Sequence, residues 1–209
     1  MIEWSSRSIG RAMAALAVIG TASLLSGCGH ENKVTRVDTG TVTDLSGRWN
    51  DTDSRMVAET VVKEAVGSPW LDNFAKSKSR QPVVIVGTVV NKSHEHINVQ
   101  TFVSDLEREL TNSQRVMFVA GKGEREEVRE ERREQAVHAR EDTQKAPGKE
   151  LGADYMMRGS ISTILDEQDG TKAVFYQIDL EMVDLENNVK SWFGQKKIKK
   201  VIEKKRTIF

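Results

Sequence analysis

The side chain with the clearest chemistry in this sequence is its single cysteine, Cys28. A thiol can act as a nucleophile, and a free cysteine that does not react is commonly buried as a small apolar side chain. The polar residues Gly29–Lys33 that follow offer nothing to bury it, and the chain has no second cysteine for a disulfide. We therefore expect this thiol to be covalently modified, with an ordinary secretory cleavage site or a buried thiol as the alternative.

Residues 1–27 have the pattern of a secretory signal peptide. Arg7 and Arg11 precede an uncharged, mostly apolar run from Ala12 to Leu25. That run is shorter than the roughly 20 apolar residues that cross a bilayer. The sequence Leu25-Ser26-Gly27-Cys28 resembles the lipobox of bacterial lipoproteins. The resemblance implies that the cysteine receives diacylglycerol and becomes the first residue of the mature chain after cleavage.

Lipidation at Cys28 would anchor the mature protein to a membrane without spanning it. Two or three acyl chains, palmitate among them, contribute about 0.8 kcal/mol for each buried CH₂ and give stable anchoring. In lipoproteins of this kind, the absence of Asp after the cysteine implies transport to the outer membrane, and Gly29 stands there. We expect an outer-membrane protein facing the periplasm.

Other residues of catalytic or metal-binding type form no recognised signature. His94-Glu95-His96 has two possible ligands but no third at a known spacing, so solvated loop histidines are the favoured interpretation. Gly121-Lys122-Gly123 lacks the spacing of a phosphate-binding loop. Neither His30 nor His138 stands beside a nucleophile motif such as Gly-x-Ser-x-Gly. We predict a binding protein without catalytic residues, metal or cofactor.

Composition and length favour one domain on a short tether. Removing residues 1–27 takes away two of 31 basic and one of 31 acidic residues, so the mature chain is nearly neutral. Neutrality argues against nucleic acid as a partner. Residues 28–44 read as a polar tether, which reaches roughly 50 Å when fully extended. Residues 45–209 are long enough for a single globular domain.

Helical and strand patterns alternate through the first half of that domain. Apolar residues at helical spacing predict a helix through Ala58–Val66, capped by Asp51 or Asp53, and a short second helix around Trp70. The run 82–90 is apolar on both faces and predicts a central strand. A helix from about 99 to 112 and a strand at 115–119 complete a β-α-β unit.

The second half predicts a charged helix and an antiparallel meander. Residues 124–142 are dominated by Glu and Arg and indicate a solvated helix, with a partner-docking helix as the alternative. Three alternating strands follow, separated by turn signals at Asp169-Gly170 and Glu186–Asn188. Together the units predict a single α/β domain with a mixed sheet packed with helices. The lysine-rich end, 196–206, could contact an anionic glycan or lipid, or protect an edge strand from aggregation.

Four segments resemble the LpoB family: Gly47–Asp53, Val84–Lys92, Glu150–Gly159, and Trp192 with Ile198-Lys199-Lys200. Its members are outer-membrane lipoproteins that activate penicillin-binding proteins, the bifunctional synthases of peptidoglycan. The resemblance implies a fold like the N-terminal domain of TolB and a role in cell-wall synthesis and cell shape, with peptidoglycan as a further candidate partner. Within the first segment, the candidate site residues, structural or interacting, are Gly47, Arg48, Trp49, Asn50, Asp51 and Asp53.

The tether departs from the family's pattern. Members from enteric bacteria carry a long, proline-rich tether that crosses the periplasm, whereas this chain has no proline between Cys28 and Pro69. A taller docking domain on the synthase, or a different partner, would accommodate the shorter tether. The alternative function is a lipoprotein subunit of an outer-membrane secretion or assembly complex, related to the curli secretion subunit.

Overall fold

A computed structural model describes residues 33–203 of the chain. The predicted signal peptide, the lipobox and Cys28 lie outside the described residues. The chain divides into two compact units, 1–39 and 40–209, and all the helices and strands described below belong to the second. No helix among residues 33–203 is long and apolar enough to cross a bilayer.

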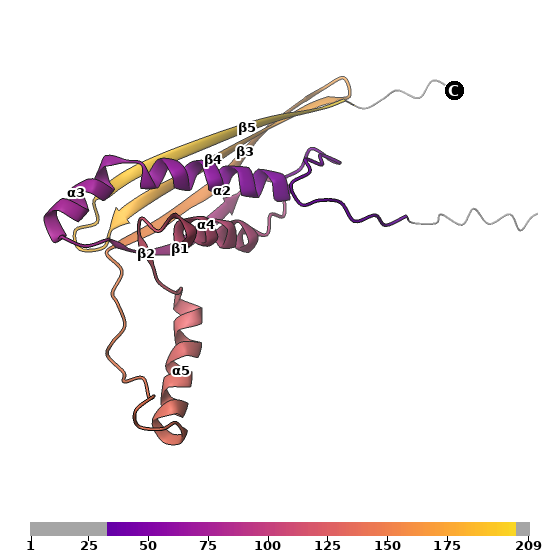
Figure 1. Cartoon of the computed structure of the whole chain (residues 1–209). Helices are drawn as coiled ribbons and strands as arrows, with labels where there is room; N and C mark the ends of the chain where they lie inside the picture. Colours follow the sequence, from indigo (N-terminus) through magenta and orange to yellow (C-terminus); the bar gives the residue numbers. More distant parts are fainter. Residues whose placement is uncertain (1–32, 204–209) are drawn as a thin grey trace, which may run out of the picture. The chain divides into compact units, whose positions relative to one another are not determined.

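The domain is built on a mixed five-stranded sheet in the order β2-β1-β3-β4-β5 (Figure 1). Its strands are β1 (Val83–Lys92), β2 (Met117–Phe118), β3 (Tyr155–Gln168), β4 (Thr171–Asp184) and β5 (Lys190–Glu203). β1 runs parallel to β2 and β3, whereas β3, β4 and β5 are antiparallel neighbours. The predicted α/β class, with a β-α-β unit joined to a meander, is confirmed.

The expected place of the first strand was wrong in one respect. β1 lies second from the edge and has only the two-residue β2 beyond it, so β3 is the central strand. The first residues of β1, Val83–Val86, are nevertheless all buried, which explains their apolar character. The apolar pattern on both faces therefore predicts a buried strand but does not determine its position in the sheet.

Helices cover one face of the sheet. α2 (Asp51–Val66) packs on α4 (Val99–Ser113) and on β5, and α4 also contacts β1 (Figure 1). Along β4 the fully buried side chains from Val174 to Met182 alternate with half-buried ones, as the pleat of a strand requires. Burial of each large apolar side chain contributes about 1.5–3 kcal/mol. The fully buried set includes Val57, Val61, Phe102, Leu106, Leu110, Met157, Ile161, Tyr176, Ile178, Leu180 and Met182.

The start of α2 corrects the predicted cap. Asn50, not Asp51 or Asp53, is the N-cap, because its side chain accepts a hydrogen bond from the Asp53 amide at 3.0 Å. The Asp53 carboxylate reaches back to the Asn50 amide at 3.0 Å, which completes a capping box. Asp53 therefore supports the cap from the third helical position.

A second helix follows α2 directly. α3 (Pro69–Lys78) begins with proline at its first position, where the missing amide hydrogen costs nothing. Trp70 Nε1 donates to the Ala65 carbonyl at 2.8 Å and ties α3 to the end of α2. The predicted helix around Trp70 is confirmed.

The meander strands are longer than their alternation suggested. β3, β4 and β5 each span 14 residues. The predicted turn at Asp169-Gly170 joins β3 to β4, with φ values of 49° and 83°. Positive φ at both central residues matches the twist of a tight hairpin.

The charged helix buries no side chain. α5 (Lys122–His138) ends four residues before the predicted boundary of 142. Its contact with the returning chain rests on Glu150, which accepts from Arg129 Nη2 at 2.9 Å and from Arg132 Nη1 at 2.6 Å. The exposure of α5 agrees with the predicted solvated helix.

Candidate functional site

Polar and aromatic side chains that could form a functional site cluster at two ends of the sheet. The first gathering, here called the Lys200 cluster, comprises Lys200, Asp44 and Asp53. Lys200 Nζ lies 2.6 Å from Asp44 Oδ1 and 2.6 Å from Asp53 Oδ2, and it donates to the Arg48 carbonyl at 3.2 Å. The Lys200 and Asp53 side chains are only 11% and 4% exposed. The cluster therefore fixes the chain entering the domain to the last strand.

The charges of this cluster shift one another's pKa. Burial alone would lower the pKa of Lys200, but its hydrogen bonds to Asp44 and Asp53 raise it above the usual value. The hydrogen bond from Lys200 lowers the pKa of Asp44. Both groups therefore stay charged at neutral pH, and the cluster serves as a fixed ion pair.

Gly47 occupies a place that no other residue fits easily. Its φ of +68° favours glycine, and an added Cβ would lie 2.4 Å from Ile202 Cδ1. Its carbonyl accepts from the Tyr176 hydroxyl at 3.3 Å, and the same hydroxyl lies 2.7 Å from Glu95 Oε1. Burial raises the pKa of Tyr176, and the Glu95 carboxylate raises it further. Tyr176 is therefore a hydrogen-bonding core residue rather than an acid.

Trp49 joins this arrangement through both its ring and its backbone. The ring packs against Phe102 and Tyr176 at centroid distances of 6.0 and 5.7 Å. The Trp49 amide donates to Glu95 Oε2 at 3.1 Å. By contrast, the side chains of Arg48 and Asp51 are exposed. The candidate segment thus combines inward residues that hold the fold with two outward charges.

The partners of this segment were not predicted. The sequence places Glu95 between two loop histidines, and Lys200 in a family-resembling segment and in the lysine-rich end, but it predicts a binding partner for neither. A signal for Lys200 was present, because it stands between Ile198 and Ile202 at the period of a strand's inward face. A lysine at such a position requires buried carboxylate partners.

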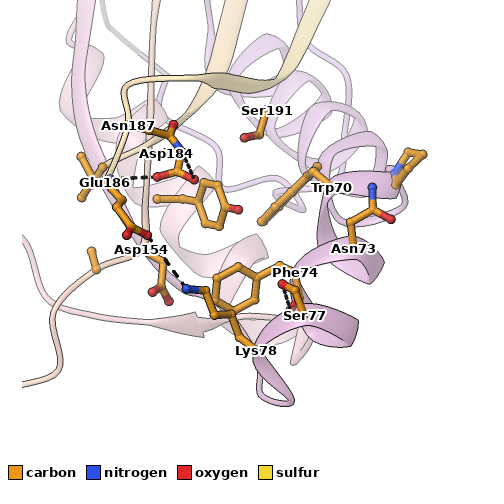
Figure 2. Close-up of a pocket in the computed structure, with 14 residues that line it drawn as sticks. Trp70, Asn73, Phe74, Ser77, Lys78, Asp154, Asp184, Glu186, Asn187 and Ser191 are labelled. Carbon is orange, nitrogen blue, oxygen red and sulfur yellow. Dashed lines mark hydrogen bonds and ion pairs between the residues drawn. The ribbon is translucent and has the colours of Figure 1, made fainter.

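The second gathering is a groove at the opposite end of the sheet, here called the end groove (Figure 2). Its volume is about 950 Å³, and it lies between α3, the start of β3 and the loop after β4. Trp70, Phe74 and Tyr155 form its floor, with the first two rings 4.8 and 5.6 Å from that of Tyr155. All three side chains are buried, so the groove presents mostly polar groups from its rim.

The carboxylates of the rim are already engaged. Asp154 binds Arg80 through both oxygens at 2.7 Å and accepts from the Val83 amide at 2.7 Å, and the arginine lowers its pKa. Asp184 accepts from the Glu186 amide at 2.8 Å. Ser77 donates to the Phe74 carbonyl of its own helix at 3.0 Å. The rim therefore suits recognition by shape and hydrogen bonding better than proton transfer.

The loop histidines are exposed. His94 Nδ1 lies 3.1 Å from Thr163 Oγ1, whereas Glu95 turns inward to Tyr176. Within residues 33–203 no group of three His, Cys, Asp or Glu side chains could hold a metal ion. Gly121, from the discarded phosphate-loop candidate, caps the start of α5.

A comparison with protein families now places the chain. The family described as "Peptidoglycan-synthase activator LpoB" matches residues 53–198. The chain belongs to the LpoB family. The matched region contains Val84–Lys92, Glu150–Gly159 and Trp192, whereas most of the Gly47–Asp53 segment precedes it and Lys199 and Lys200 follow it.

Solved LpoB structures are also similar to this chain. The C-terminal domains of LpoB from Salmonella enterica and Escherichia coli each share 13% identity and a TM-score of 0.42, covering 70% of this chain and 98% of theirs. A lipoprotein from Neisseria meningitidis shares 12% identity and a TM-score of 0.36, covering 60% of this chain and 88% of its own. A comparison with curated protein sequences found no match.

Proposed function

We propose that this LpoB family member is an outer-membrane lipoprotein that binds and activates a class A penicillin-binding protein. The proposal depends on one observation, the family match over residues 53–198. That family is described as a peptidoglycan-synthase activator. The predicted lipobox at 25–28 supports the outer-membrane localisation, because it would supply a lipid anchor at Cys28. Regulation of cell-wall synthesis, and through it cell shape, follows from this activity.

Activation by binding requires preference for one state of the synthase. A ligand with equal affinity for active and inactive states shifts nothing, however tightly it binds. The domain would therefore contact a synthase surface that changes between those states. No cofactor or catalytic residue of its own is needed for this effect.

The tether sets where the partner must meet the domain. The entering chain contacts the domain at Thr43 and Asp44, because the Asn50 side chain donates to both and Lys200 binds Asp44. From Cys28 to this point the chain reaches roughly 50 Å at full extension. We propose that the domain acts close to the outer membrane and that the synthase reaches toward it.

A secretion or assembly subunit remains a different class of function, and no observation favours it. The apolar side chains of β4, including Tyr176, Ile178 and Leu180, are fully buried in the domain core. Those strands would have to leave the core before their apolar faces could serve another assembly.

The peptidoglycan composition of a deletion strain tests the proposal in living cells. We expect fewer peptide crosslinks or shorter glycan strands in their peptidoglycan, restored by the wild-type gene. A Cys28→Ala variant should restore less, because it loses the anchor while its folded domain is unchanged. Peptidoglycan of normal composition in the deletion strain would contradict the proposal.

A further inference from the structure

The outer edge of β5 has no neighbouring strand in the described part of the chain. β5 is the last strand in the sheet and pairs with β4 from Lys190 to Glu203. Across the part of the chain that the structure describes, no strand pairs with its other edge. Such an edge presents a row of unpaired amide and carbonyl groups that can accept another strand.

The side chains of β5 on the uncovered face of the sheet form a defined pattern. Phe193 and Val201 are 57% and 59% exposed, and the exposed Lys197 and Lys199 stand between them. Neither lysine has a carboxylate within ion-pair distance in the described part of the chain, unlike Lys190, which binds Glu181 at 2.6 Å. The edge thus offers two positive charges flanked by two apolar side chains.

Protection against aggregation explains only part of this pattern. Lysines on an edge strand do discourage pairing with other chains. Phe193 and Val201 have the opposite effect, because large exposed apolar side chains on an open edge favour association. Their combination with lysines suits an edge that accepts a partner of matching charge and rejects others.

A second copy of this chain does not match the edge. Antiparallel pairing of two β5 strands centred on Ile198 would place Lys197 of one chain opposite Lys199 of the other. Like charges on paired strands are destabilising. An extended segment with acidic residues opposite the two lysines, and apolar residues toward its ends, does match.

We propose that the free edge of β5 pairs with an extended, acidic segment of the partner protein and adds it to the sheet as a further strand. Taking that partner to be the synthase rests on the proposed function. Main-chain hydrogen bonds would provide much of the affinity, and Lys197 and Lys199 would select acidic segments.

Hydrogen–deuterium exchange of the full lipoprotein in mild detergent, with and without a purified class A synthase, tests this inference. We expect the synthase to slow exchange of the β5 amides, Lys190–Glu203, while amides of α5 are unchanged. Binding and activation without slower exchange in β5 would overturn the inference and leave the proposed function standing. Absence of binding would contradict the proposed function, and the peptide experiment below would then decide the inference.

A matched pair of variants tests the charge requirement. Lys197→Glu with Lys199→Glu should weaken binding to the alternating peptide acetyl-(Val-Glu)₄-amide by about tenfold or more. Lys63→Glu with Lys76→Glu makes the same change in net charge on exposed helical positions and should leave binding unchanged. Circular dichroism confirms that both variants are folded.

Two further probes separate the alternatives. Acetyl-(Val-Lys)₄-amide should not bind, because its charges would oppose the lysines of β5. Binding of both peptides alike, binding of neither, or equal loss in the two double variants would overturn the proposal. Vesicles of phosphatidylglycerol that bind through Lys197 and Lys199 when the acidic peptide does not would assign the edge to a lipid surface and likewise overturn it.

Discussion

At the scale of single residues, the charged contacts of Lys200 are the most consequential. This lysine neutralises Asp53, which is 4% exposed, and holds Asp44 of the entering chain. Breaking a buried ion pair by removing one partner leaves the other charge without compensation. The cluster thus links the start of the domain, its first helix and its last strand.

Lys200→Met should destabilise the domain by about 3 kcal/mol, because Asp53 would remain buried without its cation. The free energy of unfolding in urea measures this change. Lys199→Met is the matched control, since its exposed side chain should contribute within about 0.5 kcal/mol. Equal effects of the two substitutions would contradict the role assigned to the cluster.

Gly47→Ala should be more destabilising than Gly148→Ala. Both glycines have positive φ, +68° and +76°, so both variants carry similar backbone strain of about 1 kcal/mol or more. Only at Gly47 does the new Cβ meet another side chain, that of Ile202. Urea unfolding of the two variants isolates this contact, and identical losses would show that Ile202 moves aside at no cost.

The ion pair of Asp154 with Arg80 predicts a defined dependence on pH. Because the folded-state pKa of Asp154 is lowered, the pair stabilises the domain above the unfolded pKa of about 3.9. That contribution is lost as pH falls through the lower folded-state pKa. The stability difference between wild type and Arg80→Gln should therefore be constant from pH 7 to 5 and shrink below about pH 4. A difference that persists unchanged at pH 2 would contradict this assignment.

At the scale of elements, α5 differs from the other helices of residues 33–203 in having no buried side chain. Its charges are paired along its own surface, as between Arg129 and Glu126 at 2.8 Å, and exposed pairs of this kind contribute little. Local contacts, chiefly those of Glu150, therefore hold it in place. Segments with few buried contacts open more easily than the core.

Glu150→Gln should loosen α5 alone. Hydrogen–deuterium exchange of the Lys122–His138 amides should become faster, while that of the buried α4 stays the same. The global free energy of unfolding should change by less than about 1 kcal/mol, because the broken pairs are solvent-exposed. Faster exchange throughout the domain would show that Glu150 supports more than α5.

Most elements could be predicted from sequence because their patterns are local. The alternation in β4 and the helical spacing of Ala58, Val61 and Val62 give type and approximate bounds directly. Contacts between residues that are far apart in the sequence leave no comparable pattern in it. The pairing of Lys200 with Asp44, and the inward turn of Glu95, depend on how β5 and the loop after β1 meet in space.

At the scale of the whole molecule, family membership agrees with the predicted lipobox and the predicted tether. The tether joins the domain beside Lys200, while the end groove lies at the far end of β4, near Asp184. The open edge of β5 runs between these two ends. A partner that pairs with this edge would lie alongside the domain over much of its length.

Mass spectrometry of the protein purified from membranes tests the anchor. The first residue of the mature chain should be Cys28, with diacylglycerol on its sulfur and an acyl group on its amine. An N-terminal peptide that contains residues before Cys28, or an unmodified thiol, would contradict the predicted lipidation.

The most direct test of the central claim is the activity of a purified class A synthase titrated with the purified lipoprotein in detergent. We predict that glycan polymerisation, peptide crosslinking or both rise with added lipoprotein and reach a plateau as the synthase becomes saturated. Unchanged rates for both reactions at concentrations where binding is saturated would contradict the claim that this protein activates its partner.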